Sequence, residues 1–282
     1  MLRVMKPFTV HQRLVDLELL RAIHQLDEGL RGVAARQAET DQVIGELHAV
    51  PYMSRPLFGL SEHPIAGLVS GYSEHTVEAT GERERYREFE DLFRGSEQFI
   101  RARQRRYLEL IAGHEPVIDL GCGRGELLDL LREAGVEYAG VDFDAGMVEH
   151  CRAKGHDVSH GDAAAFLADR ENGSLGVVFS AQVIEHLPQE ELLRLLELGH
   201  RKLRPGGLLV AETVNPHSVQ ALKTFWVDLT HRQPIFPEVA LALARFSGFE
   251  SAFVFHPNGT GSYDADRVSA GEYALVASRG GT

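Results

Sequence analysis

The sequence predicts an α/β fold built on a mostly parallel, doubly wound sheet, with a helical extension at its N-terminal end. Three observations predict it. Short apolar runs alternate with helix-length segments from residue 116 onward. A glycine-rich turn joins the first of these runs to the helix that follows it. The first 50 residues instead repeat apolar side chains at heptad spacing.

Composition and charge exclude several classes of protein. The chain has 282 residues, of which 44% are hydrophobic and 25% are charged, and its formal net charge is −12. An acidic protein lacks the cationic excess that duplex nucleic acids require. The two cysteines, Cys122 and Cys151, are too few for a disulfide framework. No apolar run reaches the roughly 18 residues of a membrane span, and the start has no signal-peptide pattern. We expect a cytoplasmic protein without a nucleic-acid partner.

Residues 1–50 are predicted to form a long helix that assembles with other copies of the chain. Alternating steps of four and three residues separate Leu19, Ile23, Leu26, Leu30, Val33, Gln37, Thr40, Ile44 and Leu47. Such a narrow seam suits a partner helix, in a pair or a trio, better than a broad core face. An amphipathic helix packed on its own domain is the alternative. Gln37 and Thr40 would help to set the register.

Residues 51–110 are predicted to form a linker followed by lid helices. Pro51, Pro56 and Pro64 break the helical pattern, whereas the chain beyond residue 81 is rich in charges of both signs. Ser96 is expected to cap a helix that begins after it.

Residues 111–282 carry the alternating pattern of the predicted sheet. Strands are expected at 117–120, 138–141, 175–180, 207–213, 251–255 and 272–277. Helices are expected at 126–133, 145–152, 190–203 and 237–246. The last two strands are close together in sequence, so they are expected to form an antiparallel pair at one edge.

The turn from Gly121 to Gly125 is the strongest functional signal. Glycines at alternate positions let the chain turn tightly and let a ligand approach the backbone. Asp142 ends the next predicted strand, where a carboxylate can accept hydrogen bonds from ribose hydroxyls. The spacing G-x-G-x-G differs from the G-x-G-x-x-G of dinucleotide-binding folds.

These residues resemble the first motif of class I S-adenosylmethionine-dependent methyltransferases. The resemblance spans roughly Arg106 to Ala277 and implies a Rossmann-like sheet of seven strands with S-adenosylmethionine as the cofactor. The positions that it implies for cofactor binding are Asp119, Gly121, Gly123, Asp142, Phe143, Asp162, Ala163 and Gln182. Asp142 would hold the ribose, and Asp162 with Ala163 would hold the adenine.

A narrower resemblance concerns the methyl acceptor. The run from Asp228 to Glu238 is similar to bacterial methyltransferases that act on sugar or polysaccharide hydroxyls, as is the stretch around Arg94. It implies that Asp228 and His231 lie at the acceptor site and that Arg94 belongs to a lid. His186, at the predicted carboxyl edge of the sheet, is a second candidate for the base that removes the hydroxyl proton.

A metal is the competing interpretation of the same histidines. Small-RNA 2′-hydroxyl methyltransferases and ubiquinone-pathway O-methyltransferases carry Glu-x-x-Glu-His at this position, which this chain resembles in Glu185 and His186, with His231 as a later ligand. Gln182 stands where the first glutamate of that pattern would be. An amide oxygen can bind a hard cation such as Mg²⁺, but it adds no charge.

Together these patterns predict an O-methyltransferase that acts on a hydroxyl of a sugar or glycan. Phe225, Trp226 and Tyr263 are candidate platforms for a sugar ring, and Asn215 and His217 are candidate polar contacts. The alternative is a methyltransferase with a quinone, phenol or amine acceptor.

Overall fold

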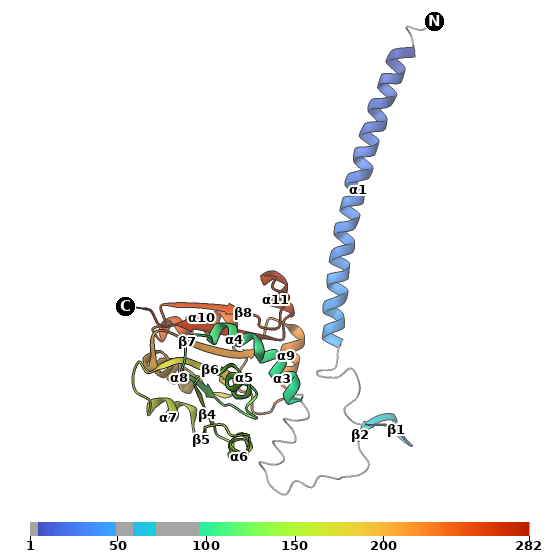
Figure 1. Ribbon diagram of the computed structural model, residues 1–282. Coiled ribbons are helices and arrows are strands. Elements are labelled where there is room, and N and C mark those ends of the chain that lie inside the picture. Colours follow the sequence, from blue (N-terminus) through green and yellow to red (C-terminus); the bar gives the residue numbers. More distant parts are fainter. Residues whose placement is uncertain (1–4, 49–58, 72–95, 282) are drawn as a thin grey trace. The chain divides into compact units, whose positions relative to one another are not determined.

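The computed structural model describes residues 5–48, 59–71 and 96–281 (Figure 1). The chain divides into two compact units, Met1–Ala49 and Val50–Thr282. No helix in these described ranges is both long enough and apolar enough to cross a membrane.

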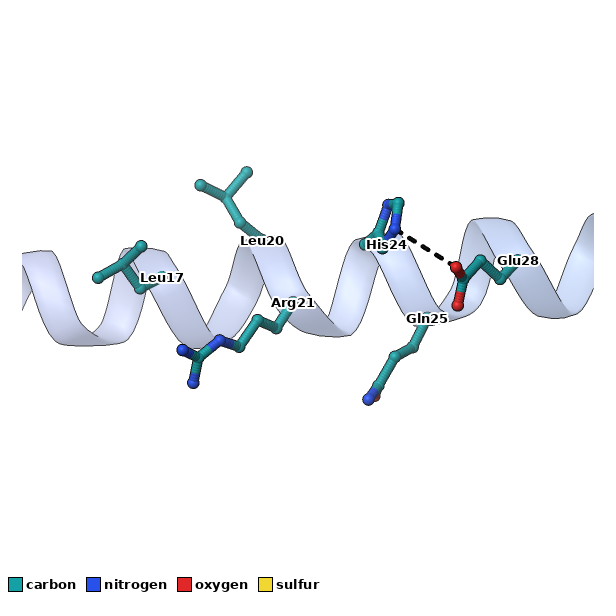
Figure 2. Close-up of a pocket in the computed structure, with 6 residues that line it drawn as sticks. All are labelled: Leu17, Leu20, Arg21, His24, Gln25 and Glu28. Carbon is teal, nitrogen blue, oxygen red and sulfur yellow. Dashed lines mark ion pairs between the residues drawn. The ribbon is translucent and has the colours of Figure 1, made fainter.

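The first unit contains one continuous helix, α1 (Met5–His48), which confirms the helix predicted for this region. The seam residues Leu19, Ile23, Leu26, Leu30, Val33 and Ile44 are all exposed. Figure 2 shows residues 17–28 of the helix, where a pocket is lined by Leu17, Leu20, Arg21, His24, Gln25 and Glu28. His24 and Glu28 form an ion pair there, with Nε2 and Oε1 3.4 Å apart.

A β-hairpin lies within the segment that the sequence suggested was a linker. Strand β1 (Gly59–His63) pairs antiparallel with β2 (Gly67–Gly71). The ring nitrogen Nδ1 of His63 accepts hydrogen bonds from the backbone of Ile65 and Ala66, and Gly67 has a positive φ of 73°. Pro64 followed by Gly67 is a turn signal that identifies such a three-residue loop.

The remaining described residues form a seven-stranded sheet in the order β5-β4-β3-β6-β7-β9-β8. Its strands are β3 (Val117–Leu120), β4 (Tyr138–Asp142), β5 (Val158–His160), β6 (Leu175–Ala181), β7 (Leu203–Val214), β8 (Ser251–Phe255) and β9 (Glu272–Ser278). Only β9 runs antiparallel to its neighbours, and it lies between β7 and β8. The predicted α/β class, the mostly parallel sheet and the antiparallel pair at one edge are therefore confirmed.

Helices cover both faces of this sheet (Figure 1). The helices that come just before β3 are α3 (Glu97–Gln104), the 3₁₀ turn η1 (Arg105–Tyr107) and α4 (Leu108–Ile111). They are followed by α5 (Glu126–Ala134), α6 (Ala145–Ala153), α7 (Ala163–Ala168), the 3₁₀ turn η2 (Ile184–His186), α8 (Gln189–Lys202), α9 (Val219–Phe225), α10 (Pro237–Phe246) and α11 (Tyr263–Ser269). As predicted, the side chain of Ser96 caps α3 by accepting from the backbone of Phe99.

Two apolar clusters hold the layers together. One contains side chains of α7, α8 and α10 against one face of the sheet, and the other packs Tyr107, Ile111 and α5 against the opposite face. Residues of β6 divide between the clusters, Val178 in the first and Phe179 in the second, because successive side chains of a strand point to opposite faces.

The order of the strands places the functional edge of the sheet. The chain proceeds outward from β3 to β4 and β5, and then crosses over to β6 on the other side of β3. Open α/β sheets bind ligands at such a switch point, outside the carboxyl ends of the strands. Here the switch point lies between β3 and β6, so a ligand is expected beside the turns that follow these two strands.

Candidate functional site

The glycine turn leaves β3 in a conformation that suits glycine. Gly121, Gly123 and Gly125 have φ angles of 69°, 53° and 83°. A Cβ atom on Gly121 would lie 2.5 Å from Cγ2 of Val183, so the turn after β3 packs directly on the turn after β6. The backbone N–H of Gly121 donates to the carbonyl of Val141, at 2.8 Å, which joins the turn to β4.

Asp142 braces this turn from the end of β4. Its Oδ2 accepts from the backbone N–H of Gly123 at 2.8 Å, and its Oδ1 accepts from the N–H of Asp144 at 2.8 Å. The carboxylate therefore lies beside the glycine turn, at the position expected of a ribose-binding acid.

The other candidate cofactor residues lie along the same edge. Phe143 is 76% exposed and follows Asp142 directly. Asp162 caps α7 by accepting from the N–H of Ala165 at 2.8 Å, and Ala163 is the first residue of that helix. Asp119 is buried near the end of β3. Arg94, the candidate lid residue, lies outside the described residues.

Gln182 is held in a rarely populated backbone conformation. With a φ of 57°, it is the one non-glycine residue in the described ranges with a positive φ. Its backbone N–H donates to the carbonyl of Glu212 at 3.0 Å, and its side-chain Nε2 donates to Oε1 of Glu212 at 3.3 Å. Such strain persists where the surroundings fix the residue, and it is common at binding sites. The amide of Gln182 is thus directed to β7 and Glu212.

Glu212 belongs to a buried polar network that the sequence did not reveal. The hydroxyl of Tyr107 donates to its Oε2 at 2.5 Å, although the two residues are 105 positions apart. Arg103 of α3 pairs with Glu272 at the start of β9, and the charge of Arg103 also acts on Glu212. The network joins the helices before β3 to the carboxyl ends of β6 and β7.

Burial raises the pKa of the Glu212 carboxyl above its usual range. The charge of Glu272 adds to the rise, whereas the hydroxyl of Tyr107, the charge of Arg103 and the amide of Gln182 oppose it. A carboxyl whose pKa is raised in the fold stabilises the protein below its unfolded pKa of about 4.3, and that stability is lost as the pH rises through the folded value.

Glu212→Gln is therefore expected to raise the melting temperature more at pH 8 than at pH 5. A flip of the Gln182 amide preserves both side-chain hydrogen bonds while the cost of ionisation disappears. We expect the gain at pH 8 to exceed the gain at pH 5 by roughly 3 °C in thermal melts. Glu197→Gln, at an exposed position of α8, is the matched control. An equal effect at both pH values would contradict a raised pKa at Glu212.

Two histidines and a carboxylate meet after β6. Glu185, His186 and His231 each place one potential ligand atom within 4.8 Å of the other two. The rings of His186 and His231 lie 4.6 Å apart between centroids. Glu185 is fully buried, and its carbonyl accepts from the backbone of Arg232, at 3.0 Å, which fixes the segment after α9 over η2.

Hydrogen bonds determine the tautomer of both rings. Nδ1 of His231 lies 2.6 Å from the carbonyl oxygen of Phe225, which can only accept, so Nδ1 carries the proton. The hydroxyl of Thr230 donates to Oδ1 of Asp228 at 2.6 Å, so its oxygen accepts from Nδ1 of His186 at 2.9 Å. In a neutral ring each histidine then has its lone pair on Nε2, which can accept a proton or bind a cation.

Asp228 lies near both histidine rings, but its carboxylate is linked by hydrogen bonds only to the ring of His186. It reaches His186 through Thr230, and its Oδ2 lies 3.9 Å from Nε2 of His231, which is beyond hydrogen-bond distance. The structure thus brings together the predicted catalytic residues His186, His231 and Asp228.

The structure buries two of the candidate acceptor contacts. Phe225 is fully buried beneath His231, with ring centroids 4.4 Å apart, so it supports that ring and is no exposed platform. Asn215 is also fully buried, and its amide donates to the carbonyls of Arg267 and Ala270 beside α11. The sequence did not distinguish core from surface at these two positions, because burial depends on packing between distant segments. Trp226 and Tyr263 are exposed, as a contact with a ligand requires.

Comparisons with known proteins identify the family of this domain. Residues 88–247 match the family model described as a methyltransferase domain. A solved structure of an S-adenosylmethionine-dependent methyltransferase from Archaeoglobus fulgidus is 31% identical, with a TM-score of 0.62, over 69% of this chain and 99% of that one.

Curated relatives match over shorter segments. A "probable S-adenosylmethionine-dependent methyltransferase" of Mycolicibacterium smegmatis is 30% identical over 53% of this chain and 58% of its own length. A ubiquinone biosynthesis O-methyltransferase of Methylococcus capsulatus is 33% identical over 37% of this chain and 45% of its own length. The chain thus spans about half the length of the curated relatives that it matches.

Proposed function

The chain belongs to the methyltransferase-domain family of class I S-adenosylmethionine-dependent proteins, and from this premise we propose that it methylates a hydroxyl oxygen of a small-molecule acceptor. The observation that carries the proposal is the pair His186 and His231, whose Nδ1 hydrogen bonds leave Nε2 as the acceptor atom in the cluster after β6. A base is what a hydroxyl acceptor needs and a neutral amine does not.

S-adenosylmethionine would bind at the carboxyl edge of the sheet, beside the turns after β3 and β6. The glycine turn would present its backbone to the cofactor, and Asp142 would accept from the ribose hydroxyls while it braces Gly123. Gln182, fixed by Glu212, would form the wall beside the reactive methyl group. The bound cofactor supplies an activated methyl group on a sulfonium.

The reaction that we propose is a displacement in one step. The acceptor oxygen bonds to the methyl carbon as the carbon–sulfur bond breaks, and the hydroxyl proton moves to Nε2 of His231 or His186. The resulting imidazolium is stabilised by the carboxylate of Glu185, which lies in the same cluster. Holding the acceptor in line with the methyl group supplies much of the remaining rate enhancement.

A phenolic or quinone-like acceptor is better supported than a sugar. Trp226 is 59% exposed and Leu229 is 88% exposed, and both lie within five positions of His231. Exposed apolar side chains in the same segment as the base suit an acceptor with an apolar body. The curated relatives that are O-methyltransferases of ubiquinone biosynthesis support the same class. A sugar hydroxyl, which the narrower resemblance implies, is the second candidate.

The donor set of Glu185, His186 and His231 also fits a divalent cation, and its two imidazoles suit Zn²⁺ or Fe²⁺ better than Mg²⁺, which prefers oxygen ligands. It offers two imidazoles and one carboxylate, and hydrogen bonds from Nδ1 to Phe225 and Thr230 orient the rings as they do in many metal sites. A bound cation would lower the pKa of the acceptor hydroxyl. Gln182 would not join these ligands while its amide remains on Glu212.

A methyl-transfer screen tests the acceptor class. The chain is incubated with S-adenosylmethionine and with a catechol, a simple phenol, a panel of sugars or a primary amine, and S-adenosylhomocysteine is measured. We expect turnover with the catechol or the phenol above the background of an Asp142→Ala control. Turnover with sugars alone would favour the second candidate, and turnover with the amine alone would overturn the proposal of oxygen methylation.

A further inference from the structure

An apolar seam runs along α1 with exposed side chains. Its six described apolar residues, from Leu19 to Ile44, are each between 45% and 67% exposed. The helix also contains Gly29 and Gly32, which lower its intrinsic stability. A helix of this kind gains stability when a second helix covers the seam. At about 1.5 Å per residue, residues 19–47 offer a seam of roughly 43 Å.

We propose that α1 pairs with α1 of a second copy of this chain, as a parallel, two-stranded coiled coil in register. In heptad positions, Ile23, Leu30, Gln37 and Ile44 are a residues, whereas Leu19, Leu26, Val33 and Thr40 are d residues. β-branched isoleucine at a with leucine at d, as in Ile23 with Leu26, favours two strands over three.

The charges and apolar side chains that flank the seam favour the parallel orientation. In a parallel pair, each g residue faces the e residue five positions later in the partner helix. Arg36 would then face Asp41 of the second copy, with opposite charge, and Val15 would face Leu20, both apolar. All four side chains are exposed in the single chain, so they can make these contacts.

The polar residues of the seam determine the register. In a parallel pair in register, Gln37 faces Gln37 of the second copy, and the two amides can hydrogen bond to each other. In an antiparallel pair, a residues face d residues, so Gln37 would face an apolar side chain in most registers. The one antiparallel register that sets Gln37 against Thr40 covers only residues 30–47, which would leave Leu19, Ile23 and Leu26 exposed.

Both polar side chains of the seam already form hydrogen bonds within the single helix. Nε2 of Gln37 donates to Oδ1 of Asp41 at 3.2 Å, and the hydroxyl of Thr40 donates to the carbonyl of Arg36 at 2.9 Å. Thr40 can therefore turn its methyl group to the seam without losing its hydrogen bond. The outward face, which carries His24 and Glu28, stays in solvent (Figure 2).

Disulfide trapping of the full chain tests orientation and register together. Leu26→Cys and Ile44→Cys are prepared separately and oxidised, and covalent dimers are scored on non-reducing gels. Both variants are expected to cross-link with themselves, because equivalent residues face each other only in a parallel pair in register. An antiparallel pair can self-link at no more than one of these two positions, so a single positive would overturn the orientation.

Two controls support the interpretation of the gels. Glu28→Cys, on the outward face, is expected to give no covalent dimer, and the parent chain should give none because Cys122 and Cys151 are buried.

Sedimentation of the unmodified chain is expected to give twice the mass of one 31.2 kDa chain. Leu26→Asp should halve that mass, whereas Gln25→Asp, which adds the same charge one position away, should not. A monomeric or trimeric parent chain would overturn the proposal.

Discussion

Replacing Asp142 with alanine is expected to weaken the binding of S-adenosylmethionine by at least about 100-fold. The carboxylate accepts from the backbone of Gly123 and of Asp144, so its loss frees the glycine turn as well as the ribose contact. Each hydrogen bond to a charged group contributes about 1.5–3 kcal/mol, and 1.4 kcal/mol corresponds to a tenfold change in affinity. Calorimetric titration with S-adenosylmethionine measures the effect.

Two further variants separate a binding role from a loss of folding. Asp157→Ala removes an exposed carboxylate from the loop before β5 and is expected to bind as the parent does. Asp142→Asn keeps the shape of the side chain, but its amide nitrogen cannot accept from a backbone N–H, so it should also bind weakly. If Asp142→Ala folds and its affinity is unchanged, Asp142 does not bind the ribose.

Replacing His231 with alanine is expected to reduce kcat by about 10²- to 10⁴-fold while the affinity for S-adenosylmethionine stays the same. Removal of a positioned general base typically costs this much. The imidazole is well positioned, since it stacks on Phe225, donates from Nδ1 to the carbonyl of the same residue and lies beside His186. Turnover and calorimetric binding are measured on the same preparations.

His150→Ala is the matched control for this experiment. His150 lies on α6 and pairs with Glu97, with the Nε2 and Oε1 atoms 3.2 Å apart, so its loss should leave kcat unchanged. A chelator then distinguishes the two roles of His231. If the parent loses activity with the chelator and regains it with a divalent cation, the result supports the ligand role of His231, and if the parent is insensitive, it supports the role of base. Full activity of His231→Ala would exclude both roles.

The glycine turn and its acid could be predicted because their signal is local. Three positive φ angles follow from three glycines, and a strand on one side with a helix on the other identifies the turn. Asp142 lies one strand later in the chain and ends β4, so topology brings it to the same edge. The ranges predicted for most strands and helices differ from the observed ones by a few residues at most.

The hairpin in residues 59–71 shows how a local signal can be missed. Pro64 was interpreted as one of the prolines that mark a linker, although a proline followed three residues later by Gly67 also forms the loop between two strands. The strands themselves are rich in glycine and short of β-branched residues, so the pattern of a strand is weak in them.

The heptads, the glycine turn, Asp142 and six of the seven strands of the large sheet could be predicted from the sequence alone, because each depends on neighbours within one element or one turn of the chain. Only the tertiary structure decided that Glu212 meets Tyr107 and Gln182, that Phe225 is buried beneath His231, and that Thr230 orients His186 from 44 positions away. Such contacts depend on how side chains of separate elements pack, and no spacing along the chain encodes the distance between them.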